Sequence, residues 1–274
     1  FLLATIESKG GDDKAARGHY EALLGLPFSN QLERLRWETT ARTNLGRIAE
    51  RAGKKSEAEE QLRAAIRQLN SLIAFPSLDD DLRSAFLVER GKTLFELGDG
   101  EQAMADFRQA RLSTPDRVES YTDPMLFVVS RGYYQESREI YRQVIAREEI
   151  RETLKLYFSL WLYDLSVRQG HEDPEAAAFL RTYDAERWPK SLALHARGQL
   201  SFEELMKGAH DPGEKAEAYF YEGLRRFRTG NTQGGKELLK KVLSTEMMGF
   251  FEYDMALYYL QSGDPPRSDP AEKR

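Results

Sequence analysis

Small and apolar residues recur along this chain at helical spacing, and their pattern is clearest between residues 91 and 115. The stretch predicts two antiparallel helices joined by a tight turn. Small side chains let two helices approach closely, while Leu94 and Phe107 fill the space between them. Gly98 supplies the turn, and Pro115 ends the second helix because proline lacks the amide hydrogen that a helix needs. The positions that carry the pattern are Gly91, Leu94, Gly98, Ala103, Phe107, Ala110 and Pro115.

The same order of helix, glycine turn and helix recurs on both sides of this stretch. The expected turn glycines are Gly11, Gly53, Gly98, Gly132 and Gly170, which are separated by 42, 45, 34 and 38 residues, and a last turn is expected at Gly230. The two longer intervals predict longer helices in the first part of the chain.

The unit at residues 91–115 resembles a tetratricopeptide repeat, a helix pair with a period of about 34 residues. The resemblance implies an all-α fold, an α-solenoid of antiparallel helix pairs wound into a superhelix, with about six repeats. A C-terminal capping helix is expected because the last repeat otherwise leaves its apolar face in water. The residues expected to pack the repeats are Gly46, Ala58, Ala65, Gly91, Ala103, Phe107, Ala110, Pro115 and Gly223.

We expect one continuous solenoid over residues 1–262. A partial first repeat occupies residues 1–30, and four repeats follow at 31–76, 77–116, 117–150 and 151–186. A divergent helix pair at 187–210 precedes the last repeat and its capping helix at 211–262. Residues 263–274 are polar and rich in proline, which predicts a disordered tail.

Several helix starts are marked by capping residues. The Asp-Pro pairs at residues 123–124 and 173–174 predict helix starts, because the carboxylate caps amide groups and the proline ring presets the first turn. Ser201 and Glu204 have the spacing of a capping box. The three aspartates at residues 79–81 lack the spaced ligands of a calcium loop, so we expect them to cap a helix.

The second half of the chain carries a further resemblance. The segments that carry it are Trp188-Pro189, Gly198-Gln-Leu-Ser201-Phe-Glu-Glu204, Ala218-Tyr-Phe-Tyr-Glu-Gly223, and Phe251-Glu-Tyr253 with Ala256. Their order resembles the C-terminal half of bacterial tetratricopeptide lipoproteins that act as envelope scaffolds. Such relatives hold cell-wall hydrolases or proteases against their targets. The resemblance implies a bacterial envelope location, in the periplasm or at the outer membrane, in preference to the cytoplasm.

Composition narrows the classes of function. The formal net charge of −5 is mild and basic residues alternate with acidic ones, so nucleic-acid binding is disfavoured. The absence of cysteine excludes disulfides, thiolate metal sites and cysteine nucleophiles in these residues. The apolar residues 1–6 are too few for a transmembrane segment, which needs about 20 residues. The chain begins without Met, which leaves room for a preceding signal peptide or lipid anchor.

No residue pattern predicts catalysis, a cofactor or a metal site. The four histidines, His19, His171, His195 and His210, have no histidine partner at ligand spacing. The glycines near Gly223 and Gly235 are not followed by a phosphate-binding Gly-Lys-Ser/Thr motif. The serines lack the context of a nucleophile elbow. We therefore expect a protein that is not an enzyme.

The first helix of each repeat lines the concave groove in tetratricopeptide superhelices. Residues one turn away from the buried stripe are therefore the candidates for contact with a ligand. These groove candidates are Thr43, Arg47, Glu50, Val88, Lys92, Phe95, Leu160, Asp164, Phe220 and Leu224.

A groove of mixed aromatic and charged character is suited to an extended peptide or a partner helix, and we expect a protein-binding scaffold. Asn44, Arg47 and Lys92 resemble part of a carboxylate clamp, but Thr43 and Val88 interrupt that match. One alternative is an assembly module that forms a homo-oligomer or a larger complex through its ends or convex face. Another is a small-molecule-binding repeat protein with a closed pocket around Trp161 or Trp188.

Overall fold

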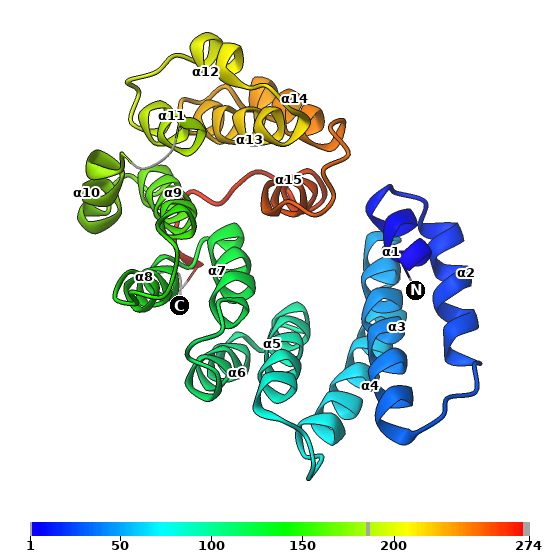
Figure 1. Ribbon diagram of the computed structural model, residues 1–274. Helices are drawn as coiled ribbons and strands as arrows, with labels where there is room; N and C mark the ends of the chain where they lie inside the picture. The colour runs from blue at the N-terminus through cyan, green and yellow to red at the C-terminus, as the bar shows by residue number, and fades with distance from the viewer. Residues whose placement is uncertain (1, 185–186, 271–274) are drawn as a thin grey trace. The chain divides into compact units, whose positions relative to one another are not determined.

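The computed structural model of the protein describes residues 2–184 and 187–270, and in these ranges the regular structure is helical (Figure 1). The helices are α1 (Leu2–Lys9), α2 (Asp13–Leu24), α3 (Gln31–Arg51), α4 (Lys55–Ile73), α5 (Asp80–Glu96), α6 (Gly100–Ser113), α7 (Glu119–Arg131), α8 (Tyr134–Ile145), α9 (Glu152–Arg168), α10 (Pro174–Thr182), α11 (Arg187–Ala196), α12 (Phe202–Gly208), α13 (Pro212–Arg228), α14 (Thr232–Leu243) and α15 (Phe251–Ser262).

Helices that follow one another in sequence pack as antiparallel pairs. The most extensive contacts join α3 to α4, α5 to α6 and α13 to α14, and Figure 1 shows each pair as a hairpin. Because most contacts are made between neighbours in sequence, each pair buries its apolar faces mainly against its own partner and the next pair. The prediction of an all-α fold built from antiparallel helix pairs is confirmed.

The chain divides into two compact units. Unit 1 comprises Phe1–Pro124 and unit 2 comprises Met125–Arg274. Unit 1 contains α1 to α6 with the beginning of α7, and unit 2 contains the rest of α7 with α8 to α15. The expectation of one continuous body over residues 1–262, with the repeat boundaries given above, stays a prediction.

Glycines end the first helix of most pairs in a left-handed conformation. The predicted turn residues Gly11, Gly53, Gly98, Gly132, Gly170 and Gly230 have φ angles of 88°, 73°, 87°, 89°, 87° and 85°. A side chain at such a φ angle clashes with the backbone, so glycine is the residue that lets the chain reverse direction in so few residues. The sequence positions of these turns therefore determine where each hairpin closes.

Paired helices approach most closely where one of them carries a small residue. A Cβ atom added at Gly46 would lie 2.8 Å from Leu62, and one added at Gly91 would lie 2.6 Å from Phe107. At Gly223 the nearest side-chain atom would be 3.3 Å away, on Leu239. The expected packing residues Ala58, Ala65, Ala103, Phe107 and Ala110 are all buried, and Pro115 follows the end of α6. Gly46, Gly91 and Gly223 thus lie at close contacts between paired helices, and a packing role for the other residues stays a prediction.

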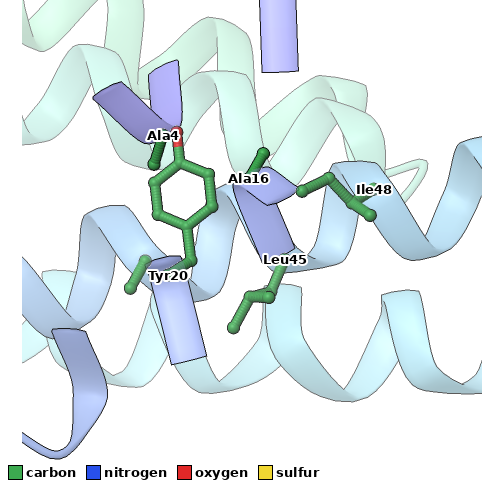
Figure 2. Packing of buried hydrophobic residues seen from close by; sticks show 6 residues of the cluster. Ala4, Ala16, Tyr20, Leu45 and Ile48 are labelled. Carbon is green, nitrogen blue, oxygen red and sulfur yellow. The ribbon is translucent and has the colours of Figure 1, made fainter. Parts of the chain in front are cut away.

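The N-terminal part of unit 1 is closed by a small apolar cluster. Figure 2 shows the ring of Tyr20 on α2 pointing toward Ala4 on α1, with Ala16, Leu45 and Ile48 beside it. Tyr20 is fully buried, and its hydroxyl lies 3.3 Å from the Thr5 hydroxyl. The partial first repeat therefore contains two helices, of which α1 packs on α2 and α2 packs on α3.

Capping explains several of the observed helix starts. Asp79 accepts a hydrogen bond from the Leu82 amide at the start of α5, and Asp173 caps α10 in the same way. Ser201 and Glu204 form the predicted capping box of α12. These starts were encoded locally, because the capping side chain and the amide that it accepts from lie within three residues of each other.

The start of α7 differs from the prediction. The helix begins at Glu119, and Pro124 lies inside it, whereas the sequence predicted a start at residues 123–124. The turn before the proline is held by tertiary contacts, since Ser120 and Tyr121 are buried and the Tyr121 hydroxyl donates to the Pro115 carbonyl. Packing therefore offsets the hydrogen bond that an internal proline removes.

The predicted disordered tail is also corrected in part. Residues 263–270 pack against other segments of unit 2, where the Asp269 side chain is buried and accepts a hydrogen bond from the Tyr134 amide. The remaining positions of that prediction, residues 271–274, lie outside the described residues. The low hydrophobicity of the segment predicted disorder, but its contacts are polar and use the backbone, so composition does not reveal them.

The close helix contact at Gly91 leads to a stability prediction. Gly91→Ala will lower the free energy of unfolding by about 1–3 kcal/mol, because the added methyl group forces Phe107 or the α6 backbone to move. Gly18→Ala is the matched control, since Gly18 is an exposed residue in α2 with nothing within 4 Å of an added Cβ atom. It will raise the same free energy by about 0.5–1 kcal/mol. Urea unfolding followed by circular dichroism measures both, and equal effects at the two sites would contradict the packing described.

Candidate peptide-binding groove

A cavity of about 270 Å³ opens between α5 and α7 of unit 1. Helix α5 supplies one wall, the segment between α6 and α7 supplies the base, and the first turns of α7 supply the other wall. The lining residues are Asp81, Ser84, Ala85, Val88, Glu89, Thr114, Arg117, Glu119, Ser120 and Asp123. We call this cavity the α5–α7 groove.

The floor of the α5–α7 groove is a triangle of buried hydroxyl groups. The Thr114 hydroxyl lies 2.8 Å from that of Ser84 and 2.7 Å from that of Ser120, and the two serine hydroxyls are 3.0 Å apart. Ser84 and Thr114 also donate to the Ala110 carbonyl at 3.2 Å. The triangle ties α5, the end of α6 and α7 together, so the floor is preorganised.

The walls of the groove are acidic. Four carboxylates line it, those of Asp81, Glu89, Glu119 and Asp123, against one guanidinium, that of Arg117. Arg117 forms an ion pair with Asp81, and both side chains are about half exposed. The lining therefore carries a formal charge of −3, which favours a cationic ligand group over an anionic one.

Lys92 lies beside the groove between two of its acids. Its ammonium nitrogen is 2.7 Å from Glu89 and 3.4 Å from Asp123. Burial opposes the charged ammonium, but the attraction of Glu89 and Asp123 outweighs it and raises the pKa of Lys92 to about 12. Lys92 therefore stays charged and joins α5 to α7 across the groove.

Arg47 adds a charged group on α3 to the charged groups on α5 and α7. Its Nε atom lies 2.9 Å from Glu96 on α5, and the Arg47 side chain is 29% exposed. Burial of Glu89 opposes its charged form, but Lys92 and Arg47 together hold the pKa of that carboxyl below its usual range. The charges of these side chains therefore alternate in sign from α3 through α5 to α7 of unit 1.

In unit 1 the structure brings part of the predicted groove together. Arg47 and Lys92 share Glu89 as a charged neighbour, and Val88 lines the cavity although it is 5% exposed. Thr43 is buried, Phe95 is half-buried, and Glu50 is exposed. A carboxylate clamp is disfavoured, because the cations expected to form it are paired with carboxylates of the chain itself.

The groove candidates in unit 2 require a correction. Leu160, Phe220 and Leu224 are 1%, 0% and 2% exposed, so their side chains belong to the helix core and do not line an open surface. Asp164 is buried too, and its Oδ2 atom accepts a hydrogen bond from Arg168 at 2.7 Å. The error has one cause: α9 and α13 are covered on more than one side, so a residue one turn from the buried stripe is also enclosed.

Two of the buried carboxyl groups of unit 2, those of Glu217 on α13 and Glu252 on α15, interact electrostatically. Glu217 accepts hydrogen bonds from the Tyr157 hydroxyl and the Trp188 indole, and Glu252 accepts one from the Tyr221 hydroxyl at 3.0 Å. Burial raises the pKa of both carboxyls, and the neighbouring Glu217 helps to raise that of Glu252 to about 8. Near neutral pH, Glu252 is therefore mainly a neutral acid in the core.

The tryptophans considered for a small-molecule pocket are both engaged by protein groups. Trp161 is 1% exposed, and its ring packs edge-on against Phe251 with centroids 5.5 Å apart. Trp188 donates its indole hydrogen to Glu217. These contacts give both rings a role in packing unit 2.

Other chemistry is sparse in the part of the chain that the structure describes. No group of three or more His, Asp or Glu side chains in these residues is placed to hold a metal ion. His195 is buried, with Nδ1 3.0 Å from the Leu200 carbonyl and Nε2 3.3 Å from Glu222. Within the described ranges, no helix has the length and apolar character to span a membrane.

Most of the polar groove lining could not be singled out from the sequence. In the sequence, Ser84 was an ordinary helix residue, and Ser120 lay before the helix start predicted at residues 123–124. Thr114 was only the residue before Pro115. The one available signal was that Ser84 and Val88 lie one turn apart on the same helix face. The contribution of α7 was hidden because its start was predicted too late.

Comparison with known proteins finds likeness among solved structures. No family model matches this chain, and no curated protein matches it. Among solved structures, the chain is similar to the crystal structure of a tetratricopeptide repeat protein from Parabacteroides merdae, with 16% sequence identity and a TM-score of 0.43. The match covers 96% of this chain and 97% of that one.

The buried carboxyl on α15 predicts a dependence of stability on pH. The pKa of Glu252 is raised in the folded state, so its contribution is fully present below the unfolded pKa of about 4.5 and is lost as pH rises through about 8. The free energy of unfolding will fall over this range, with a slope approaching about 1.4 kcal/mol per pH unit. Glu252→Gln will flatten the curve in denaturant titrations at several pH values. A wild-type curve that is flat or rising there would contradict this assignment.

Proposed function

We propose that this chain is a non-enzymatic scaffold that binds an extended peptide segment of a partner protein in the α5–α7 groove. The observation that carries the proposal is the groove itself: a cavity of about 270 Å³ with a preorganised hydroxyl floor and four carboxylates in its walls. Such a surface offers several modest contacts along one line, which suits a peptide.

The charge of the walls selects the chemistry of that peptide. A lysine or arginine side chain entering the groove meets Glu119 and Asp123 from α7 and Glu89 from α5. An anionic side chain meets net repulsion, because Lys92 is already balanced by Glu89 and Asp123. The proposed partner segment is therefore basic, with small or apolar residues beside the basic one to lie against Ala85 and Val88.

We also assign the helix pairs to the tetratricopeptide family. The support is local: a small residue in the first helix packs on a large residue of the second, as for Gly91 against Phe107, and a left-handed glycine closes each turn. A bacterial envelope location is part of the same proposal. It rests on the order of motifs between residues 188 and 256, which resembles envelope scaffold lipoproteins.

Reversal of charge at the groove tests the binding site. A displayed library of random peptides is selected against the full chain, and the selected peptides are then titrated against variants. We expect the selected sequences to contain lysine or arginine, and Glu119→Lys combined with Asp123→Lys to weaken their binding at least about tenfold, because two favourable charge contacts become repulsive. Binding will also weaken as salt concentration rises.

Glu59→Lys is the matched control for this experiment. Glu59 is an exposed acid on α4 that pairs with Arg63, and it does not line the groove. Its reversal changes the net charge by the same amount per residue and should leave peptide binding unchanged. The groove is not the binding site if the affinity of the selected peptides is unchanged by Glu119→Lys with Asp123→Lys. The same conclusion follows if Glu59→Lys weakens their binding equally.

A further inference from the structure

Residues 263–270 follow α15 as a segment of unit 2 that bends at Asp264, Arg267 and Ser268. In Figure 1 their red trace leaves α15, passes α9 and runs toward α8. Asp264 pairs with Lys236 on α14 at 2.9 Å, and Arg267 donates to the Phe227 carbonyl at the end of α13 at 2.6 Å. The segment thus follows the ends of successive helices, where backbone groups are available for hydrogen bonding.

Asp269 caps a helix to which it does not belong. Its Oδ2 atom accepts a hydrogen bond from the Tyr134 amide at 3.0 Å, and the Asp269 side chain is 4% exposed. Tyr133, the residue at the N-cap position of α8, provides no capping hydrogen bond from its side chain. The tail therefore supplies the capping acceptor that the Tyr133 side chain does not provide, and the helix dipole favours a negative charge there.

Arg168 holds the middle of the tail. Its guanidinium is 1% exposed, pairs with Asp164 at 2.7 Å and donates from Nη1 to the Pro266 carbonyl at 2.6 Å. A buried guanidinium needs acceptors for its hydrogens, and the tail backbone provides one of them. This contact recognises a backbone carbonyl group of the tail and demands no particular side chain.

Gly132 makes room for the tail at the closest approach. A Cβ atom there would lie 2.8 Å from the Pro266 ring and 3.2 Å from the Ser268 carbonyl. Gly132 has a φ angle of 89° and its carbonyl accepts a hydrogen bond from Gln169 at 2.7 Å, so its position is fixed. The surface is therefore shaped to the segment that lies on it.

We propose that this edge of unit 2 is a second peptide-binding site, which takes extended partner segments of the type Pro-Pro-x-x-Asp-Pro and is occupied in the free protein by residues 265–270 of the chain itself. We call it the tail site and define it by Gly132, Tyr134, Arg168 and Phe227. The site lies within unit 2, and the proposal is independent of the α5–α7 groove.

The chemistry of the occupant follows from its contacts. Pro265 is buried and Pro266 is half-buried, and proline rings preset an extended backbone, which lowers the entropy lost on binding. The aspartate must lie three residues after the second proline, because that spacing joins the Arg168 contact to the α8 amide. A partner segment with the same spacing satisfies the same groups.

The tail can also be exchanged. Gly263 is exposed, has a φ angle of 112° and joins the segment to α15 as a hinge. A short tether gives the tail an effective concentration on the order of millimolar. The tail therefore excludes weak ligands from the site, but a partner that binds more tightly or at several points displaces it.

A labelled synthetic peptide with the sequence of residues 262–274 tests the proposal. Its binding to the full chain is measured by fluorescence anisotropy, and the same titration is made with the full chain carrying Asp269→Ala. Because this substitution weakens the competing tail and leaves the tail site intact, the peptide will bind the variant about tenfold more tightly than the natural chain. Circular dichroism verifies that both chains are folded.

Two controls separate the tail site from other surfaces. A peptide carrying Asp269→Asn will bind the Asp269→Ala chain about tenfold more weakly than the natural peptide, and because both peptides are titrated against the same chain the comparison contains no difference in protein folding. Glu119→Lys with Asp123→Lys in the α5–α7 groove will leave the affinity of the tail peptide unchanged. This result keeps failure of the tail site distinct from failure of the proposed groove function.

Three results would overturn the proposal. The first is absence of peptide binding to the Asp269→Ala chain at millimolar peptide concentration. The second is equal affinity for the natural and the Asp269→Asn peptides. The third is a dimer of the natural chain, measured by light scattering, that Asp269→Ala converts to a monomer, because that result assigns the site to the tail of a second copy.

Discussion

Close approach of the two helices in each pair is the constraint on which this structure depends. It is possible only where one helix carries no side chain, as at Gly46 and Gly91, and where the facing helix offers a large one, as at Leu62 and Phe107. The interhelical distance set in this way also fixes how far α5 stands from α6, whose end leads into the base of the groove. The α5–α7 groove is therefore a product of the core packing as well as of its own polar residues.

Ion pairs also join one helix hairpin to a neighbouring hairpin. Arg47 on α3 reaches Glu96 on α5, and Lys92 on α5 lies between Glu89 of its own helix and Asp123 on α7. In unit 2, Arg138 on α8 pairs with Asp173 at the start of α10 at 3.1 Å. Such pairs align successive hairpins in register, while the apolar contacts supply most of the stability.

The fold was predictable from the sequence to the extent that its signals are local. Turn glycines such as Gly98 and caps such as Asp173 act on residues within a few positions, and the structure has them where they were expected. Groove residues depend on which faces of a helix become covered, and this is a property of distant segments. Leu160 and Phe220 show the result, because their helices are enclosed on several sides. The tail was missed for a related reason, since its contacts with Arg168 and Tyr134 involve backbone groups that no sequence pattern marks.

The hydroxyl triangle on the floor of the groove has a consequence for selectivity. Each of Ser84, Thr114 and Ser120 can both donate and accept, and their protons can rotate without movement of any heavy atom. The floor is therefore amphoteric: it can present a hydrogen to a guest carbonyl or a lone pair to a guest amide. The fixed charges above the floor therefore discriminate among guests, whereas the floor itself accepts a peptide backbone in either direction.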